Sequence, residues 1–171
     1  MQALFKAFWE IALWRRSPAD LPDSPALLLV AGLAYAAFSA LQSFMIFGTD
    51  SVLGRTFADL ALLALPLWVL LSLARRQRRY RQTLTALLGT GAVLAPFVVA
   101  LLAFKAPAES SYPIALLVWG GSVGVVLWYL FVIGYILRAA LDTGMFTGVA
   151  IALAYVAGSA ALLSTLFPAG A

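Results

Sequence analysis

The residue best suited to chemistry in this sequence is Asp59, a carboxylate near the start of a long apolar stretch. A charged side chain is costly within a membrane span, so it is a candidate site by default, here for a proton or a cation. Arg55 precedes it by four residues, which places both side chains on one helical face. The simpler interpretation is a local Arg55–Asp59 ion pair at the membrane interface. Arg138 and Asp142 repeat this spacing, and a pair is expected there too.

A second polar group, Gln42 with Ser39 and Ser43, interrupts the preceding apolar stretch. Such side chains usually form hydrogen bonds to a neighbouring helix, worth ~0.6 kcal/mol on average. The rarer outcome is a substrate pocket or a polar path through the membrane, lined by Gln42 and Asp59. The pattern favours helix packing and leaves the polar path as the alternative.

Composition excludes several kinds of catalytic and metal site. The chain has 171 residues with no cysteine and no histidine, which removes thiol nucleophiles, disulfides, imidazole metal ligands and the usual general base near neutral pH. The sequence also contains no phosphate-binding loop, no carboxylate pair at hydrolytic spacing and no cluster of metal ligands. We therefore expect no enzymatic activity, no cofactor and no metal ion.

The overall composition is that of a membrane protein. Hydrophobic residues make up 64% of the chain and charged residues 11%, against about 45–50% and about 25% in an ordinary soluble domain. Five apolar stretches reach the length of about 17–25 residues that a helix needs to cross the hydrocarbon core. The predicted fold is therefore an all-α integral membrane bundle of five transmembrane helices within residues 26–167. The predicted helices are 26–48, 57–74, 83–104, 113–137 and 145–167.

Five arginines lie together between the second and third apolar stretches, in the segment SLARRQRRYRQT. This clustering is typical of a loop that stays in the cytoplasm. If it does, the N-terminus is cytoplasmic, the C-terminus lies outside, and nine of the 11 basic residues face inward. We expect a multi-pass protein of the inner (plasma) membrane whose loop binds anionic headgroups, at ~1 kcal/mol per basic residue, and binds no nucleic acid. The five residues are Arg75, Arg76, Arg78, Arg79 and Arg81.

The N-terminal residues 1–16 predict an interfacial amphipathic helix, because apolar residues recur along one face and polar residues along another. A signal peptide is the competing interpretation. However, Lys6 and Glu10 interrupt the apolar run and no small-residue cleavage site follows, so we expect the segment in the mature protein. Residues 17–25 contain three prolines and predict a hinge before the first span.

Glycines mark the expected contacts between helices. Gly120 and Gly124 stand four residues apart in the fourth apolar stretch, and Gly144 and Gly148 repeat the spacing at the start of the fifth. Small residues at this spacing let two helix backbones approach closely. The sequence therefore predicts helix packing at all four positions.

Two segments that follow the basic loop resemble bacterial proteins grouped with the Yip (Ypt-interacting protein) membrane family. They are RQTLTALLGTGAVLAPF (Arg81 to Phe97) and YLFVIGYILRAALDTGMFTGVAIALAYV (Tyr129 to Val156). The resemblance implies a cytoplasmic N-terminal segment, five spans and a short C-terminal end. Eukaryotic members are similar to trafficking and membrane-shaping factors that contact small GTPases through a longer N-terminal region than the one here, so no GTPase contact is implied.

These observations predict a non-catalytic polytopic membrane protein. Its expected role is that of an accessory or scaffold subunit of a membrane assembly, or of a membrane-organising factor. Its expected partners are the bilayer and other membrane subunits or further copies of itself. The alternative is a small channel or transporter component, with Gln42 and Asp59 on its path.

Overall fold

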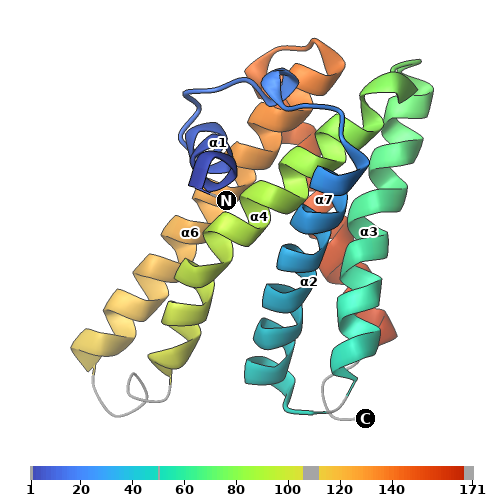
Figure 1. Ribbon diagram of the computed structural model, residues 1–171. Helices are drawn as coiled ribbons and strands as arrows, with labels where there is room; N and C mark the ends of the chain where they lie inside the picture. Colours follow the sequence, from blue (N-terminus) through green and yellow to red (C-terminus); the bar gives the residue numbers. More distant parts are fainter. Residues whose placement is uncertain (1, 50, 106–111, 168–171) are drawn as a thin grey trace.

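The computed structural model describes residues 2–49, 51–105 and 112–167 (Figure 1). Within these ranges every regular element is a helix, and five helices are long and apolar enough to cross a membrane. The predicted five-helix fold is confirmed, and the chain is a multi-pass membrane protein. The five helices are α2 (Pro25–Phe47), α3 (Val52–Leu73), α4 (Tyr80–Ala103), α6 (Tyr112–Leu141) and α7 (Met145–Leu166).

The helix boundaries follow local signals. The Ser24 hydroxyl accepts a hydrogen bond from the backbone three residues on, and Pro25 occupies the first turn of α2, where its missing N–H costs no bond. The largest difference from the sequence prediction is the start of α3, at Val52 instead of residue 57. Asp59 therefore lies about two turns inside this helix, deeper than the sequence predicted.

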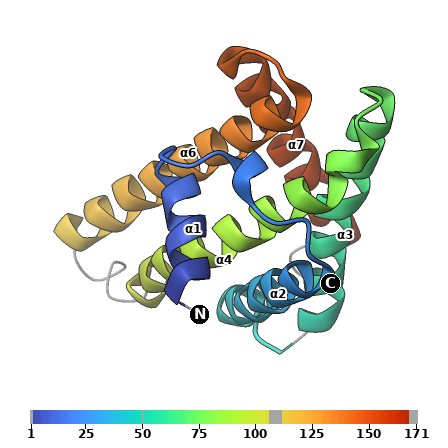
Figure 2. The same ribbon diagram turned by 45° about the horizontal axis from the view of Figure 1, so that its top comes forward.

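Helix α4 is the centre of the bundle. It contacts α2, α6, α3 and the N-terminal helix, and every residue from Thr83 to Ala95 is buried. Helices α6 and α7 form the other closely packed pair. Figure 2 shows the N-terminal helix α1 (Gln2–Ala12) lying across α4, with α3 and α7 on the far side.

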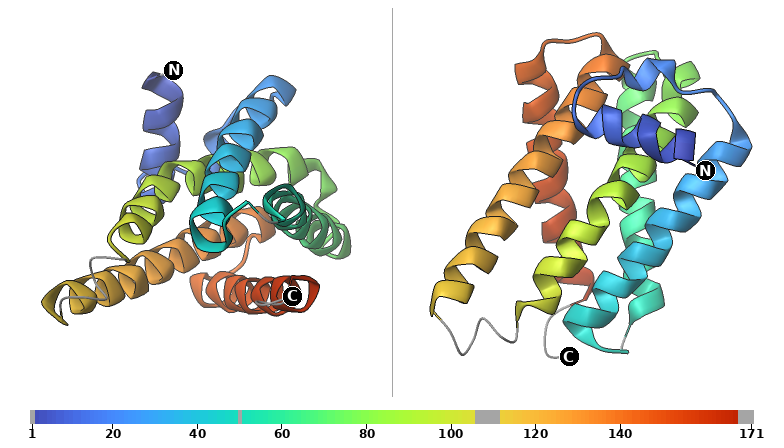
Figure 3. Two further views of the ribbon diagram at one scale, coloured as in Figure 1. Left: turned by 90° about the horizontal axis from the view of Figure 1, so that it is seen from below. Right: turned by 60° about the vertical axis from the view of Figure 1, so that its left-hand side comes forward.

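The connections divide the bundle into two ends (Figures 1 and 3). One end carries the turns η1 (Pro18–Asp20) and η2 (Gln77–Arg79) and the α6–α7 connection, and we call it the arginine-loop end. The other carries the α2–α3 turn and the last residues of α7, and we call it the Arg55 end. Nine basic residues lie toward the first end, and only Arg55 and Lys105 toward the second, as the sequence predicted.

The amphipathic helix α1 turns its apolar face toward the protein. Ala7, Phe8, Ile11 and Ala12 are buried against α4 and α6. A Cβ added at Gly89 would overlap the Phe8 ring, so the absence of a side chain there makes room for this contact. The predicted helix is thus present, but it ends four residues before the predicted residue 16, and the apolar face formed by these four buried residues is covered by other helices of the chain.

Aromatic side chains fix this docked position. The Trp9 ring stacks on Phe97 with centroids 6.1 Å apart and meets Trp128 edge-on at 5.9 Å. Trp128 Nε1 also donates a hydrogen bond of 2.9 Å to the carbonyl oxygen of Ala12. Carbonyls in the last turn of a helix have no intrahelical partner, so this bond caps α1.

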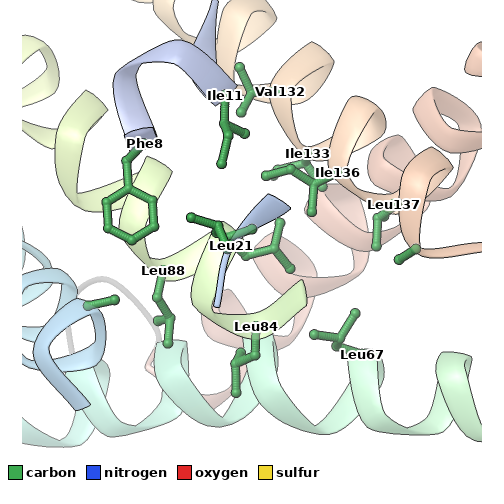
Figure 4. Close-up of a cluster of buried hydrophobic side chains, with 14 of the residues drawn as sticks. Phe8, Ile11, Leu21, Leu67, Leu84, Leu88, Val132, Ile133, Ile136 and Leu137 are labelled. Carbon is green, nitrogen blue, oxygen red and sulfur yellow. The ribbon is translucent and has the colours of Figure 1, made fainter. Parts of the chain in front are cut away.

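Buried apolar side chains of several elements form one core cluster (Figure 4). Side chains from α1, the hinge, α3, α4 and α6 point toward one another there and fill the space between the helices. This cluster holds α1 and the spans as one packed unit. Its labelled members are Phe8, Ile11, Leu21, Leu67, Leu84, Leu88, Val132, Ile133, Ile136 and Leu137.

Of the four glycines predicted to pack helices, Gly148 does so. A Cβ there would overlap the carbonyl oxygen of Gly134, so α6 and α7 touch backbone to backbone. At Gly120, Gly124 and Gly144, no described atom beyond the local backbone lies within 4 Å of an added Cβ. The structure therefore shows no close helix contact within the described chain at these three positions, and packing there against another chain stays a prediction. The first half of α6, which contains Gly120 and Gly124, diverges from α7 (Figure 3).

Candidate functional site

A cavity of about 230 Å³ with a few polar groups on a mostly apolar wall lies inside the bundle, lined by residues of α2, α3, α4, α6 and α7. Its polar wall includes Asp59, Ser39 and Gln42, and most of its remaining wall is apolar. A second cavity of about 180 Å³, nearer the Arg55 end, shares these three residues and adds Ser43 and Arg55. Asp59 therefore stands where the two cavities adjoin. We call the first the inner cavity and the second the outer cavity.

The Asp59 carboxylate is bound by a neutral donor from another helix. The Ser39 hydroxyl of α2 donates a hydrogen bond of 2.9 Å to Asp59 Oδ2. Among the residues that the structure describes, no Lys or Arg nitrogen lies within 4.0 Å of this carboxylate. The predicted Arg55–Asp59 ion pair is therefore wrong.

Arg55 binds groups at its own end of the bundle instead. Its Nε donates to Ser51 Oγ at 3.1 Å, and its Nη2 donates to the backbone carbonyl of Phe167 at 3.1 Å. The guanidinium carbon also lies 3.6 Å from the centre of the Phe47 ring and 4.9 Å from that of Phe167. Cation–π contacts contribute about 0.5–2 kcal/mol each. Together these contacts hold Arg55 away from Asp59, although both line the outer cavity.

Sequence reasoning missed two tyrosines of this site. Tyr35 of α2 and Tyr129 of α6 line the inner cavity beside Asp59. Gly91 leaves room for the Tyr35 ring, which would lie 2.7 Å from an added Cβ. Tyrosines in membrane helices gather near the interfaces, whereas both of these stand near the middle of their helices. A tyrosine in the middle of a predicted span is therefore the feature of the sequence that could have identified both residues.

On the arginine-loop side of Asp59, the side chains of α3 that face the bundle are apolar. Leu63, Leu67 and Leu71 follow Asp59 on successive turns of α3, and each is buried. Tyr129 lines the inner cavity and also an apolar cavity of about 310 Å³ between α3 and α7. Of the two cavities that share Asp59, the outer one lies toward the Arg55 end, and the inner one extends to Tyr35 and Tyr129 near the middle of the bundle.

The arginine loop lies far from these cavities and binds other parts of the chain. Arg81 forms an ion pair with Asp23 of the hinge, with Nε 3.0 Å from Oδ1 and Nη2 3.1 Å from Oδ2. Arg79 Nη1 donates to the carbonyl oxygens of Ala139 and Ala140 near the end of α6. The loop thus ties α3 and α4 to both the hinge and α6.

Asp142, just after α6, is the carboxylate that receives two of the loop arginines. It forms ion pairs with Arg76 and with Arg79, whose Nη1 lies 3.2 Å from Oδ1. Arg138 instead lies over the Tyr135 ring, 5.4 Å from its centroid. The predicted Arg138–Asp142 pair is therefore not formed among the described residues, because Asp142 lies beyond the helix end and turns toward the loop.

Hydrogen bonds from Arg76 first, and then from Arg79, lower the pKa of Asp142 below its usual range. An unperturbed Asp titrates with a pKa of about 3.9. Because the pKa of Asp142 is lower in the folded state than in the unfolded state, its ion pairs with Arg76 and Arg79 stabilise the fold fully above the unfolded-state pKa. This stabilisation is lost as the pH falls through the lowered folded-state pKa. The loop contacts are therefore fully formed near neutral pH.

Among the described residues, no group of three or more Asp, Glu, Cys or His side chains is placed to hold a metal ion. Comparison of the chain with protein-family models, with curated proteins and with solved structures found no match.

Proposed function

We propose that this chain is a small transport protein, or a component of one, that binds a cationic solute at Asp59. The supporting observation is the carboxylate itself, which lies two turns inside α3, lines two cavities and accepts a hydrogen bond from the neutral hydroxyl of Ser39, with no ion pair among the described residues. Charges inside a membrane are costly unless they are paired. A bound cation or a proton supplies the missing counter-charge. Both this role and the second candidate below are non-catalytic.

Asp59→Asn tests this proposal. Asparagine keeps the shape and can still accept the bond from Ser39, so the protein should fold and insert normally. The probe is 3-methylbutylammonium, a small organic cation. Loss of a charged hydrogen-bonding partner costs about 1.5–3 kcal/mol, so we expect the variant to bind this probe at least about tenfold more weakly than the wild type. Titration calorimetry of the purified protein measures the affinity, and uptake of the same probe into proteoliposomes measures transport.

The control variant is Glu10→Gln, which removes a carboxylate whose ion pairs are both 3.9 Å long. This variant should bind and transport the probe as the wild type does. If Asp59→Asn and the wild type show equal affinity and uptake, the carboxylate is not the binding group and the proposal fails.

An accessory or scaffold subunit is the second candidate, and the divergent half of α6 favours it. Leu117 and Trp119 are 74% and 69% exposed there, and Gly120 and Gly124 have no described neighbour. Small residues let a further helix approach closely. We infer that a helix of another subunit or of a second copy packs on this face.

We also propose that the arginine-loop end faces the cytoplasm, in the inner (plasma) membrane. The excess of basic residues at that end supports this orientation. Because the chain has no cysteine, Arg78→Cys and Thr49→Cys each introduce a single thiol, one at each end. We expect a membrane-impermeant maleimide to label Thr49→Cys in intact cells and Arg78→Cys only after permeabilisation. The opposite labelling pattern would reverse the orientation.

Arg75 and Arg78 are our candidates for contact with anionic headgroups. Both are exposed, and within the described ranges neither forms an ion pair, whereas the other three loop arginines bind carboxylates. A basic residue near an anionic surface contributes about 1 kcal/mol. The proposal includes no nucleic-acid partner, and the likeness to Yip proteins stays a prediction.

A further inference from the structure

Arg55 and Asp59 carry opposite charges on the wall of one cavity of about 180 Å³, yet they form no ion pair with each other. A ligand with one charge of each sign would complement both. We propose that the solute bound here is a small zwitterion with an apolar side chain, such as an apolar α-amino acid. This inference rests on the proposed function, since it assigns the solute of the Asp59 site.

The two charges are held apart by separate contacts. Arg55 is fixed by Ser51, by the Phe167 carbonyl and by the Phe47 ring, all at its own end. Asp59 is fixed by Ser39 on α2. Each side chain is thus oriented toward other partners in the structure. The separation is therefore built into the site, and a bound molecule can span it.

Each charge keeps capacity for a ligand. In the described part of the chain, the hydrogen bonds of Arg55 come from Nε and Nη2, so Nη1 can donate to a ligand carboxylate. Such charge-assisted bonds are roughly twice as strong as neutral ones. Asp59 accepts one bond in the structure, and a carboxylate has about four acceptor positions. Asp59 can therefore accept bonds from an ammonium group, with Gln42 beside it.

The inner cavity supplies a place for an apolar side chain. It adjoins the outer cavity at Asp59, and its wall includes Leu94, Val98, Val125 and Val126. An ammonium group at Asp59 would direct a branched aliphatic group into this space, while the carboxylate points back to Arg55. Small-molecule pockets usually measure about 300–1,000 Å³. Since the two cavities measure about 230 and 180 Å³, the solute must be small.

Three matched probes test the assignment on the purified full-length protein. They are L-leucine, 3-methylbutylamine, which is leucine without its carboxylate, and 4-methylpentanoate, which is leucine without its amine. We expect the wild type to bind leucine at least about tenfold more tightly than either analogue, since each analogue leaves one charge unpaired. Arg55→Gln should abolish the preference over 3-methylbutylamine, and Asp59→Asn the preference over 4-methylpentanoate.

Controls separate binding from folding. Arg78→Gln removes an arginine at the opposite end and should leave all three affinities unchanged. Arg55→Lys keeps the positive charge and should retain part of the preference for leucine, which keeps the test usable if Arg55→Gln does not fold.

The outcomes separate the solute assignment from the proposed function. If the wild type binds 3-methylbutylamine as tightly as leucine, the zwitterion is wrong while cation binding at Asp59 stands. If no probe binds to the wild type, both proposals are overturned.

Discussion

The Gly148→Ala variant is expected to lose about 1–3 kcal/mol of folding free energy, the usual cost of overpacking, and Gly148→Leu more. The added Cβ would overlap the carbonyl oxygen of Gly134 and lie 2.9 Å from Arg138 Cβ and 3.1 Å from its backbone nitrogen. Backbone atoms cannot move aside as a flexible side chain can, so α6 and α7 must separate. Unfolding in mixed detergent micelles measures the loss.

The matched control is Gly158→Ala, the same substitution on the same helix. No described atom beyond the local backbone lies within 4 Å of a Cβ at Gly158, and alanine favours a helix by about 1 kcal/mol over glycine. This variant should therefore be neutral or more stable. Equal stability of Gly148→Ala and Gly158→Ala would contradict the close α6–α7 contact.

A further comparison separates packing within the chain from packing between chains. Replacing both Gly120 and Gly124 with leucine should leave the fold of the single chain intact, because neither glycine faces a described neighbour. If the chain acts as a subunit through this face of α6, the same variant should lose its co-purifying partner. Retention of a stoichiometric partner would count against the second candidate function.

The five spans could be predicted because the bilayer leaves the chain few choices. Backbone polar groups must be paired within each span, so a long apolar stretch becomes a helix. The boundaries were less predictable where charge interrupts the stretch. The predicted span started at residue 57, after Arg55, yet the helix begins at Val52 and continues through both Arg55 and Asp59. Contacts from α2 and from the end of α7 make these polar positions tolerable.

The members of the site could be predicted one by one, but their partners could not. Residue type alone identified Asp59 and Gln42 as unusual in a span. Local spacing then paired Asp59 with Arg55, although Arg55 binds the carbonyl of a residue 112 positions away. The same reasoning placed close packing at Gly120, where α6 has already diverged from α7. Spacing shows which face a residue occupies, whereas tertiary structure decides what that face meets.

Ile11→Ala is expected to weaken the docking of α1 by about 2–5 kcal/mol, the cost of emptying a buried aliphatic site. Ile11 is fully buried, near Val132 of α6 (Figure 4). Because α1 precedes the five spans and joins them through the hinge, we expect the effect to appear first at α1. We expect faster tryptic cleavage at Lys6 and a changed fluorescence of Trp9, whose ring leaves Phe97 and Trp128, with little change in the unfolding of the spans.

Phe5→Ala on the same helix is the control, because the Phe5 side chain is 58% exposed. A helix that is docked on protein loses more from Ile11→Ala, since Ile11 faces α4 and α6. A helix that is adsorbed on lipid loses more from removal of the ring that enters the bilayer. A larger effect at Phe5 would therefore indicate that α1 lies in the headgroup layer, as the sequence predicted. The larger effect at Ile11 would make α1 an integral part of the bundle, whose loss should loosen α4 beside the Asp59 cavity.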